Sequence, residues 1–267
     1  MSPGADPAQP DGGSDSAGVP WEGRRFSDNP HAADDGRADP ALERALRDFR
    51  AGEGSEVQVV DAYRRARLLI PLIAQKGDGD GDAVGAHGLA VDKTQELSIV
   101  TVAAPDGRHV LPVFTSVDTM RVWDAQARPV PAEGIRTALA ASADDTDLIV
   151  IDPGSETEFV IRRPAVWAIA QSQQWEPSHR SPEVAAGLNE SVGGELAIID
   201  LALEPGDPEA RGRGPELIVR LHVAAGLDQS QLDAVLARLA RRWAADDRVA
   251  VLVDSLAVKL VRSDPLS

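Results

Sequence analysis

Residues 111–123, Leu111-Pro-Val-Phe-Thr-Ser-Val-Asp-Thr-Met-Arg-Val-Trp123, carry the clearest fold signal in the chain. Their apolar first half predicts a strand whose last residue, Phe114, enters a core. Ser116 then stands where a helix N-cap is expected, and Asp118 lies in the positively polarised first turn of that helix. Trp123 ends the helix and packs back on the strand. Each of these residues has a structural task, so the motif predicts a fold and no catalysis.

The segments around this motif predict an α/β sheet domain over residues 39–173. Asp39 and Pro40 have the pattern of an N-cap and first helical residue. Pro71, inside an apolar run, indicates an edge strand. Helices are expected from residue 40 to Gly52, from Ser55 to Tyr63, and over residues 116–123, 131–141 and 164–171, and strands over residues 67–74, 97–102, 109–114, 147–151 and 158–161.

The C-terminal residues have a separate pattern. Residues 174–193 are rich in Pro, Ser, Glu, Asn and Gly without periodicity, which predicts a linker. Residues 194–262 predict a ββαββ domain with a helix over 230–243 and strands over 195–203, 216–223, 248–253 and 256–261. One helix covers one face of this mostly antiparallel sheet. We therefore expect the other face to pack on the N-terminal domain or on a second copy of the chain.

Residues 1–38 are rich in Pro, Gly, Ser and Asp and poor in apolar side chains, which predicts a disordered acidic tail. Trp21 and Phe26 are the candidate anchors of this tail on a domain or a partner. The predicted fold class is thus α+β: a tail, an α/β domain and a small ββαββ domain.

Composition excludes several classes of function. The chain of 267 residues has no Cys, which removes disulfides, thiol nucleophiles and thiolate metal sites. Its formal net charge of −16 repels phosphate backbones and anionic lipids, so we expect no nucleic-acid or membrane partner. No signal peptide or membrane span is evident in the sequence. These features together predict a cytoplasmic protein.

Catalytic and metal-binding motifs are missing from the sequence. No phosphate-binding loop, dinucleotide fingerprint or Gly-x-Ser-x-Gly elbow occurs. The alternating carboxylates of residues 78–82 resemble the start of a calcium loop, but Ala83 and Leu89 stand where Gly and Glu are needed. The five histidines, His31, His87, His109, His179 and His222, lack metal-ligand spacing. We expect no catalytic residue, no cofactor and no metal.

Two strings resemble the SseB family, named for enhanced serine sensitivity, in its actinobacterial form. They are Phe26-Ser-Asp-Asn-Pro-His-Ala-Ala-Asp-Asp-Gly-Arg-Ala-Asp-Pro-Ala-Leu-Glu-Arg-Ala-Leu46 and the more specific residues 111–123. The resemblance covers residues 24–172, whereas the C-terminal unit is similar only in general pattern. It implies no catalytic residue. The candidate structural signature comprises Phe114, Thr115, Ser116, Asp118 and Trp123.

The expected function is a non-catalytic module for protein interaction or regulation, with a protein partner or a second copy. The family name links it to serine or sulfur amino-acid metabolism. The alternative is an enzyme of unrecognised type whose site is not visible in the sequence. An adaptor of a secretion system has no support, because heptads and a membrane anchor are missing.

Overall fold

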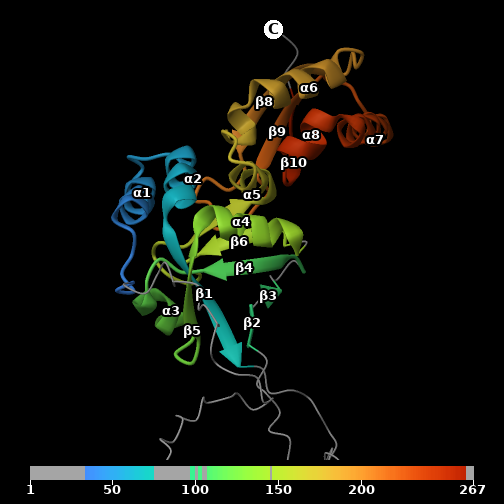
Figure 1. The fold of residues 1–267 in the computed structure, drawn as a ribbon. Coiled ribbons are helices and arrows are strands. Elements are labelled where there is room, and N and C mark those ends of the chain that lie inside the picture. The colour runs from blue at the N-terminus through green and yellow to red at the C-terminus, as the bar shows by residue number, and fades with distance from the viewer. Residues whose placement is uncertain (1–33, 75–96, 100–101, 104–106, 145, 263–267) are drawn as a thin grey trace, which may run out of the picture. The chain divides into compact units, whose positions relative to one another are not determined.

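The structure is a computed structural model that describes residues 34–74, 97–99, 102–103, 107–144 and 146–262. Within these residues it is a mixed α+β protein with eight α-helices and three small sheets, as the sequence predicts (Figure 1). The predicted tail anchors Trp21 and Phe26 lie outside the described residues.

The N-terminal strands form two sheets that meet at one point. The first has the order β2–β1–β5, with β1 Arg67–Ala74, β2 Leu97–Ile99 and β5 Arg128–Glu133. The second has the order β3–β4–β6–β7, with β3 Val102–Ala103, β4 His109–Val113, β6 Leu148–Ile151 and β7 Phe159–Arg162; only β4 and β6 run parallel. Leu69 of β1 and Phe114 exchange two backbone hydrogen bonds, which joins the sheets.

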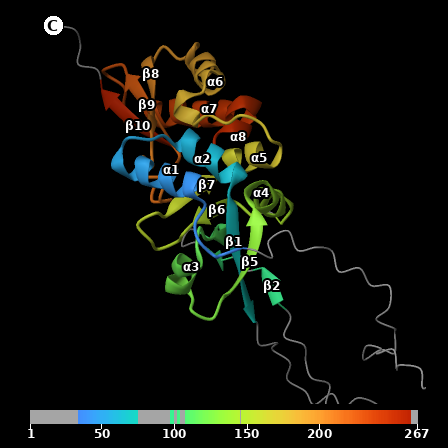
Figure 2. The ribbon, with the colours of Figure 1, turned by 60° about the vertical axis from the view of Figure 1, so that its left-hand side comes forward.

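Helices α1 Pro40–Ala51 and α2 Glu56–Arg65 lie side by side, and α4 Gly134–Ala143 packs with α5 Arg163–Ala170 (Figure 2). The predicted N-caps are confirmed, since the side chains of Asp39 and Ser55 accept bonds from the first backbone N–H groups of α1 and α2. The main core is mostly Leu, Val, Ile and Ala. Its largest fully buried side chains include Tyr63 and Phe159.

Pro71 lies in the central strand of its sheet, so its predicted edge position was wrong. The N–H and C=O groups of Leu69 form hydrogen bonds with Phe114, on the side of β1 opposite to β5. Backbone groups alternate in direction along a strand, so those of the other odd-numbered residues of β1 also point away from β5. Pro71 faces Pro129 at a pair that needs no N–H from either residue. On its other side the partner changes from Phe114 to β2, whose ladder begins at Leu72. The missing N–H of Pro71 therefore breaks no described ladder bond.

The predicted helix over residues 131–141 starts too early. Residues 128–133 form the edge strand β5, and α4 begins at Gly134. Pro131 indicated a helix start, but an edge strand accepts proline when its N–H position faces away from the ladder. Gly134 is required at the turn, since a Cβ there would lie 1.9 Å from the carbonyl oxygen of Tyr63.

The chain after residue 173 differs in two respects from the predicted linker and ββαββ domain. Residues 174–193 contain a 3-10 helix, η1 Ser178–Arg180, and α6 Pro182–Val192, so the predicted linker is structured there. Val184 and Leu188 of α6 are fully buried. Residues 248–253, predicted as a strand, fall mostly in the helix α8 Asp247–Leu252, which Asp246 caps.

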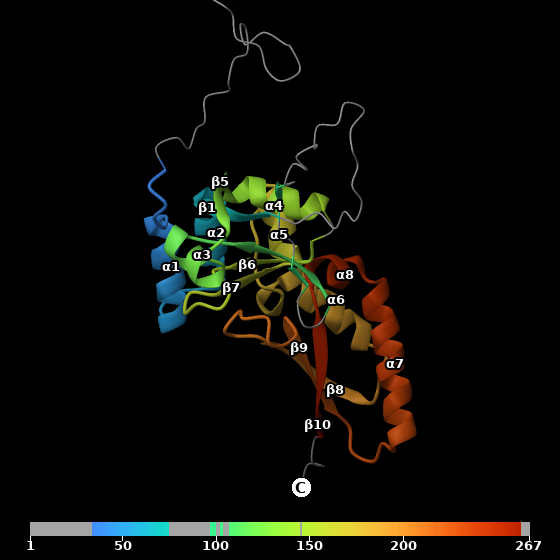
Figure 3. The same cartoon turned by 90° about the horizontal axis from the view of Figure 1, so that it is seen from below.

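The C-terminal sheet is accordingly three-stranded, in the order β10–β9–β8, and β10 pairs parallel to β9. Its strands are β8 Ile198–Pro205, β9 Leu217–Val223 and β10 Leu256–Arg262, and α7 Gln229–Ala245 runs beside them (Figure 3). Helices α6, α7 and α8 cover the face that carries Leu217, Val219, Leu221 and Val223.

The opposite face of this sheet stays open in the described part of the chain. On β10 the residues of that face, Ala257 and Lys259, are exposed, and Arg220 of β9 pairs with Glu204 of β8 there. The expectation that this face packs on the N-terminal domain was therefore wrong. The ion pair between Arg220 and Glu204 gives the physical reason, because a sheet face that carries charged side chains can remain in contact with water.

Candidate functional site

The loop between β8 and β9, residues 206–216, reaches back to strand β7. The two ends of the loop run close together at Gly206 and Gly214. A Cβ on Gly206 would lie 2.2 Å from the carbonyl oxygen of Pro215, and a Cβ on Gly214 would lie 2.6 Å from the carbonyl oxygen of Gly206. At the tip, Ala210 is only 4% exposed and joins the N-terminal core. Its carbonyl accepts a hydrogen bond of 2.8 Å from the Val160 N–H on the free edge of β7.

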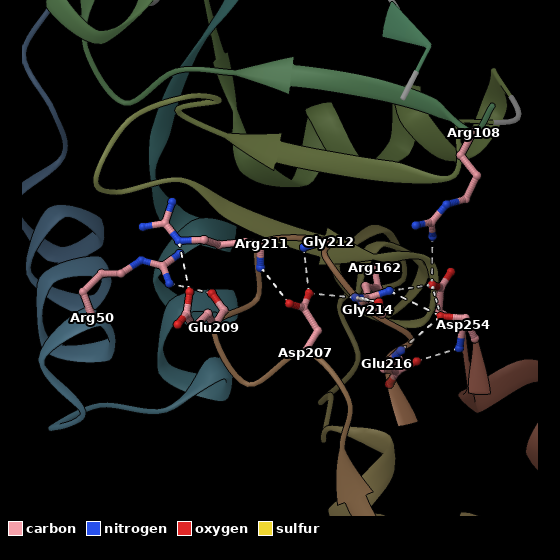
Figure 4. A network of polar contacts seen from close by, with 11 residues as sticks. Arg50, Arg108, Arg162, Asp207, Glu209, Arg211, Gly212, Gly214, Glu216 and Asp254 are labelled. Atoms are coloured by element: carbon pink, nitrogen blue, oxygen red, sulfur yellow. Dashed lines mark hydrogen bonds and ion pairs between the residues drawn. The ribbon is translucent and has the colours of Figure 1, made fainter. Parts of the chain in front are cut away.

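Asp207 holds the loop in this shape. Its carboxylate accepts hydrogen bonds from the backbone N–H groups of Gly212 at 2.7 Å and Arg211 at 3.3 Å. The same carboxylate pairs with the Arg162 Nη2 atom at 2.8 Å (Figure 4). Asp207 thus connects the loop geometry to an arginine at the end of β7.

Arg162 is the centre of a buried ion network that we call the Arg162 clamp, made of Arg162, Asp207 and Asp254. The Arg162 side chain is 8% exposed, and its Nη1 atom lies 3.1 Å from Asp254 Oδ2. Its Nη2 atom also donates to the Gly214 carbonyl at 2.8 Å. Arg108 immediately precedes β4, and its Nη1 atom lies 3.0 Å from Asp254 Oδ2 (Figure 4). A buried guanidinium needs this many partners, because an unpaired buried charge is strongly destabilising.

Two further arginines fasten the loop from outside. Arg50 of α1 donates to the Glu209 carbonyl at 2.5 Å and to the Glu158 carbonyl. Arg211 donates to the carbonyls of Ser155 at 3.3 Å and Glu156 at 3.2 Å, beside β7. The charged side chains of Asp207 and Arg211 are therefore used in contacts within the chain.

A small cavity of about 20 Å³ lies next to the clamp. Its polar lining comes from α2, β7, η1 and the β8–β9 loop: Glu56, Arg162, His179, Asp207 and Glu216. Burial raises the pKa of Glu56 to about 7, and the nearby Glu216 carboxylate adds to the rise. Burial also raises the pKa of Glu216. Two carboxyls in one cavity disfavour each other's ionisation.

The size of this cavity limits its chemistry. A volume of about 20 Å³ accommodates about one water molecule. The cavity can therefore bind water or a proton, and it is too small for an organic substrate. Among the described residues, no group of three or more His, Cys, Asp or Glu side chains is placed to hold a metal ion.

The predicted signature residues lie at the end of β4. Phe114 is fully buried, and its ring centroid lies 5.3 Å from that of Trp123. Ser116 forms a capping box with Thr119 at the start of α3 Val117–Trp123. Asp118 is exposed in the first turn of this helix. The structure thus assigns packing and capping contacts to these residues and does not bring them to the Arg162 clamp.

Thr115 has the most specific contact of the signature. Its N–H and its hydroxyl each donate to the Asp152 carboxylate at 2.8 Å. Asp152 is 1% exposed and has a φ of 46°, a left-handed conformation that is uncommon outside glycine. Thr157 donates to the same carboxylate at 3.0 Å. These bonds join the ends of the parallel strands β4 and β6.

Other sequence candidates are scattered. His31, His87 and the acidic residues 78–82 lie outside the described residues. His109 is exposed at the start of β4, and His222 lies on the open face of the C-terminal sheet. Of the three histidines that the structure describes, only His179 reaches the cavity, where burial and then Arg180 lower its pKa.

Sequence reasoning missed the clamp and the cavity. One signal was available: residues 206–214 place Asp207, Arg211 and three glycines between two strands, in a loop too long for a tight hairpin. Nothing local in the sequence connects Glu56 with Glu216, because 160 positions separate them and only the tertiary fold brings them together.

Comparison with known families identifies one region. Residues 42–168 match the family model described as SseB protein N-terminal domain. Comparisons with curated proteins and with solved structures give no match. In the described part of the chain, no helix has the length and apolarity needed to span a membrane. The match ends within α5, before η1 and the C-terminal sheet. Residues 42–168 are therefore similar in sequence to the SseB protein N-terminal domain.

Proposed function

We propose that this chain is a non-catalytic SseB protein of the actinobacterial type that acts as a protein-interaction or regulatory module. The family match supports the SseB part of the proposal. The link to serine or sulfur amino-acid metabolism comes from the resemblance to a family named for serine sensitivity. The proposed partner is another protein or a second copy.

A groove beside the edge strand β10 is the observation that carries this proposal. It has a volume of about 470 Å³ and is lined mainly by apolar side chains of α7, α8 and β10. Trp243 and Leu256 are among its lining residues. Val258 and Leu260 on β10 are 36% and 38% exposed. Exposed apolar residues on a strand edge next to an apolar groove are typical of protein-binding surfaces.

The charged groups support a non-catalytic role. A pKa near 7, as for Glu56, is also the property of a general acid or base, which is what the alternative of an enzyme would require. The cavity beside Glu56 is too small for a substrate, however, and the clamp residues are paired with each other. The larger concave surface on β10 offers apolar contacts and few convergent polar groups.

A photo-crosslinking experiment in a lysate of the host tests the proposal. Benzoylphenylalanine is placed at Val258 on β10 or, as a control, at Val122 on α3, which is 85% exposed. We expect a discrete crosslinked protein, or a dimer of this chain, from position 258 only. Equal crosslinking at the two positions, or none at 258 with a substrate turned over by the purified protein, would contradict the proposal.

A further inference from the structure

Glu56 and Glu216 bring a carboxyl from each part of the chain into one small cavity. Glu56 is the first residue of α2 in the SseB domain, and Glu216 immediately precedes β9 in the C-terminal sheet. The two side chains line the same space of about 20 Å³, together with Arg162 and Asp207 of the clamp. Ionisation of these two carboxyls therefore affects the surface by which the two parts contact each other.

Glu216 is held in place by bonds to the C-terminal part. One of its oxygens accepts from the Asp254 N–H at 2.6 Å, and the other from the Ser178 N–H at 3.4 Å. Its own N–H donates to Ser255 at 3.1 Å. Because these bonds fix its carboxyl against the cavity, Glu216 cannot turn away from Glu56 without losing them.

The charges around the pair leave an excess of negative charge. Asp207 faces Glu56, and Asp254 faces Glu216; each raises the pKa of the neighbouring carboxyl. Arg162 is the cation that faces both, and it is already paired with those two aspartates. His179 lines the cavity with a lowered pKa, so it brings no positive charge at neutral pH.

We propose that Glu56 and Glu216 form a proton-dependent latch that holds α2 of the SseB domain against the C-terminal sheet when one proton is bound to the pair and weakens when both carboxyls are ionised. With the proton bound, one carboxyl donates a hydrogen bond, directly or through a water molecule that fits the cavity, to the other. Without it, two half-buried carboxylates repel each other across the small cavity. The pair titrates as a unit, so its two steps belong to both residues.

The direction of the pH effect follows from proton binding. Folding raises the pKa of Glu56 from 4.5 to about 7. The folded chain then binds more protons than the unfolded chain between these values, so its stability falls as the pH rises through this window. The stabilisation is complete at acid pH and is lost above about pH 7.

Urea unfolding of the full chain between pH 5.5 and 8.5 tests the latch. We expect the folding equilibrium constant of the parent protein to fall by the order of tenfold or more over this range, and that of Glu56→Gln to stay nearly constant. Glu53→Gln, an exposed position next to α2, is the matched control and should keep the pH dependence of the parent. The same pH dependence in the parent and in Glu56→Gln would overturn the proposal.

A measurement on the parent protein covers the case in which Glu56→Gln fails to fold. Glutamate labelled with ¹³C at the side-chain carboxyl is titrated by NMR from pH 4 to pH 9. The latch predicts one glutamate resonance with a midpoint near neutral pH, while a set of resonances that all titrate near about 4.3 excludes it. Opening of the latch is followed in parallel by protease cleavage in residues 206–216, which should increase with pH in the parent.

Discussion

Replacement of Arg162 by Met should be among the most destabilising single changes in the contact between strand β7 and the C-terminal part of the chain. The change keeps much of the apolar stem but removes the charge that pairs with Asp207 at 2.8 Å and Asp254 at 3.1 Å. These carboxylates are only 6% and 5% exposed, so water cannot fully replace the lost partner. Loss of one member of a buried ion network costs about 3–5 kcal/mol.

The remaining bonds place the expected loss near the lower end of that range. Asp254 keeps Arg108, and Asp207 keeps the N–H groups of Arg211 and Gly212. We therefore expect about 3 kcal/mol from urea unfolding near pH 6. A domain of ordinary stability has about 5–15 kcal/mol in total, so the loss is measurable and leaves a folded population.

Arg163→Met is the matched control for this prediction. Arg163 is the next residue, is half-buried, and stacks on the Trp167 ring at 5.3 Å. Loss of such a contact costs about 1 kcal/mol or less. A second variant, Arg162→Met with Asp207→Asn and Asp254→Asn, should recover part of the loss because it removes the unpaired charges. Equal effects of the changes at 162 and 163 would refute the clamp.

Three further predictions concern other parts of the chain. Phe114→Ala should cost about 3–5 kcal/mol in urea unfolding, because the side chain is fully buried; near-parent stability would contradict its place in the core. Thr115→Val should cost about 1–3 kcal/mol by removing one of the two hydroxyl donors of the buried Asp152 carboxylate, and Thr115→Ser should recover most of it. Replacing the three aspartates of residues 78–82 with Asn should leave the melting temperature unchanged with and without calcium, and a calcium-dependent rise in the parent alone would point to a metal site.

Local structure was predictable where one residue type has one physical task. Asp39, Ser55 and Ser116 supply an oxygen to the unpaired N–H groups at a helix start, and the structure confirms all three as N-caps. The strand over residues 67–74 was predicted with its observed bounds, because Pro71 in the middle of the apolar run disfavours a helix there.

Errors arose where the same pattern fits two structures. A short apolar run such as residues 249–253 suits a buried strand or a buried helix, and here Asp246 decides for a helix by capping it. Pro131 is compatible with a helix start and with an edge strand, and only the pairing of β5 with β1 distinguishes them. The Arg162 clamp depends on contacts between residues about 45 and 92 positions apart, for which local periodicity gives no signal.

Hydrogen exchange at the Val160 amide tests most directly whether the C-terminal part is fixed to the N-terminal domain by the β8–β9 loop. Strand β7 is the edge of its sheet, and the Val160 N–H has the Ala210 carbonyl of the loop as its partner at 2.8 Å. The clamp predicts that this amide exchanges slowly in the parent protein and much faster in Arg162→Met under conditions where that variant is folded. Fast exchange at Val160 in the parent, beside slow exchange in the central strand β6, would show that the loop does not dock and would contradict the account.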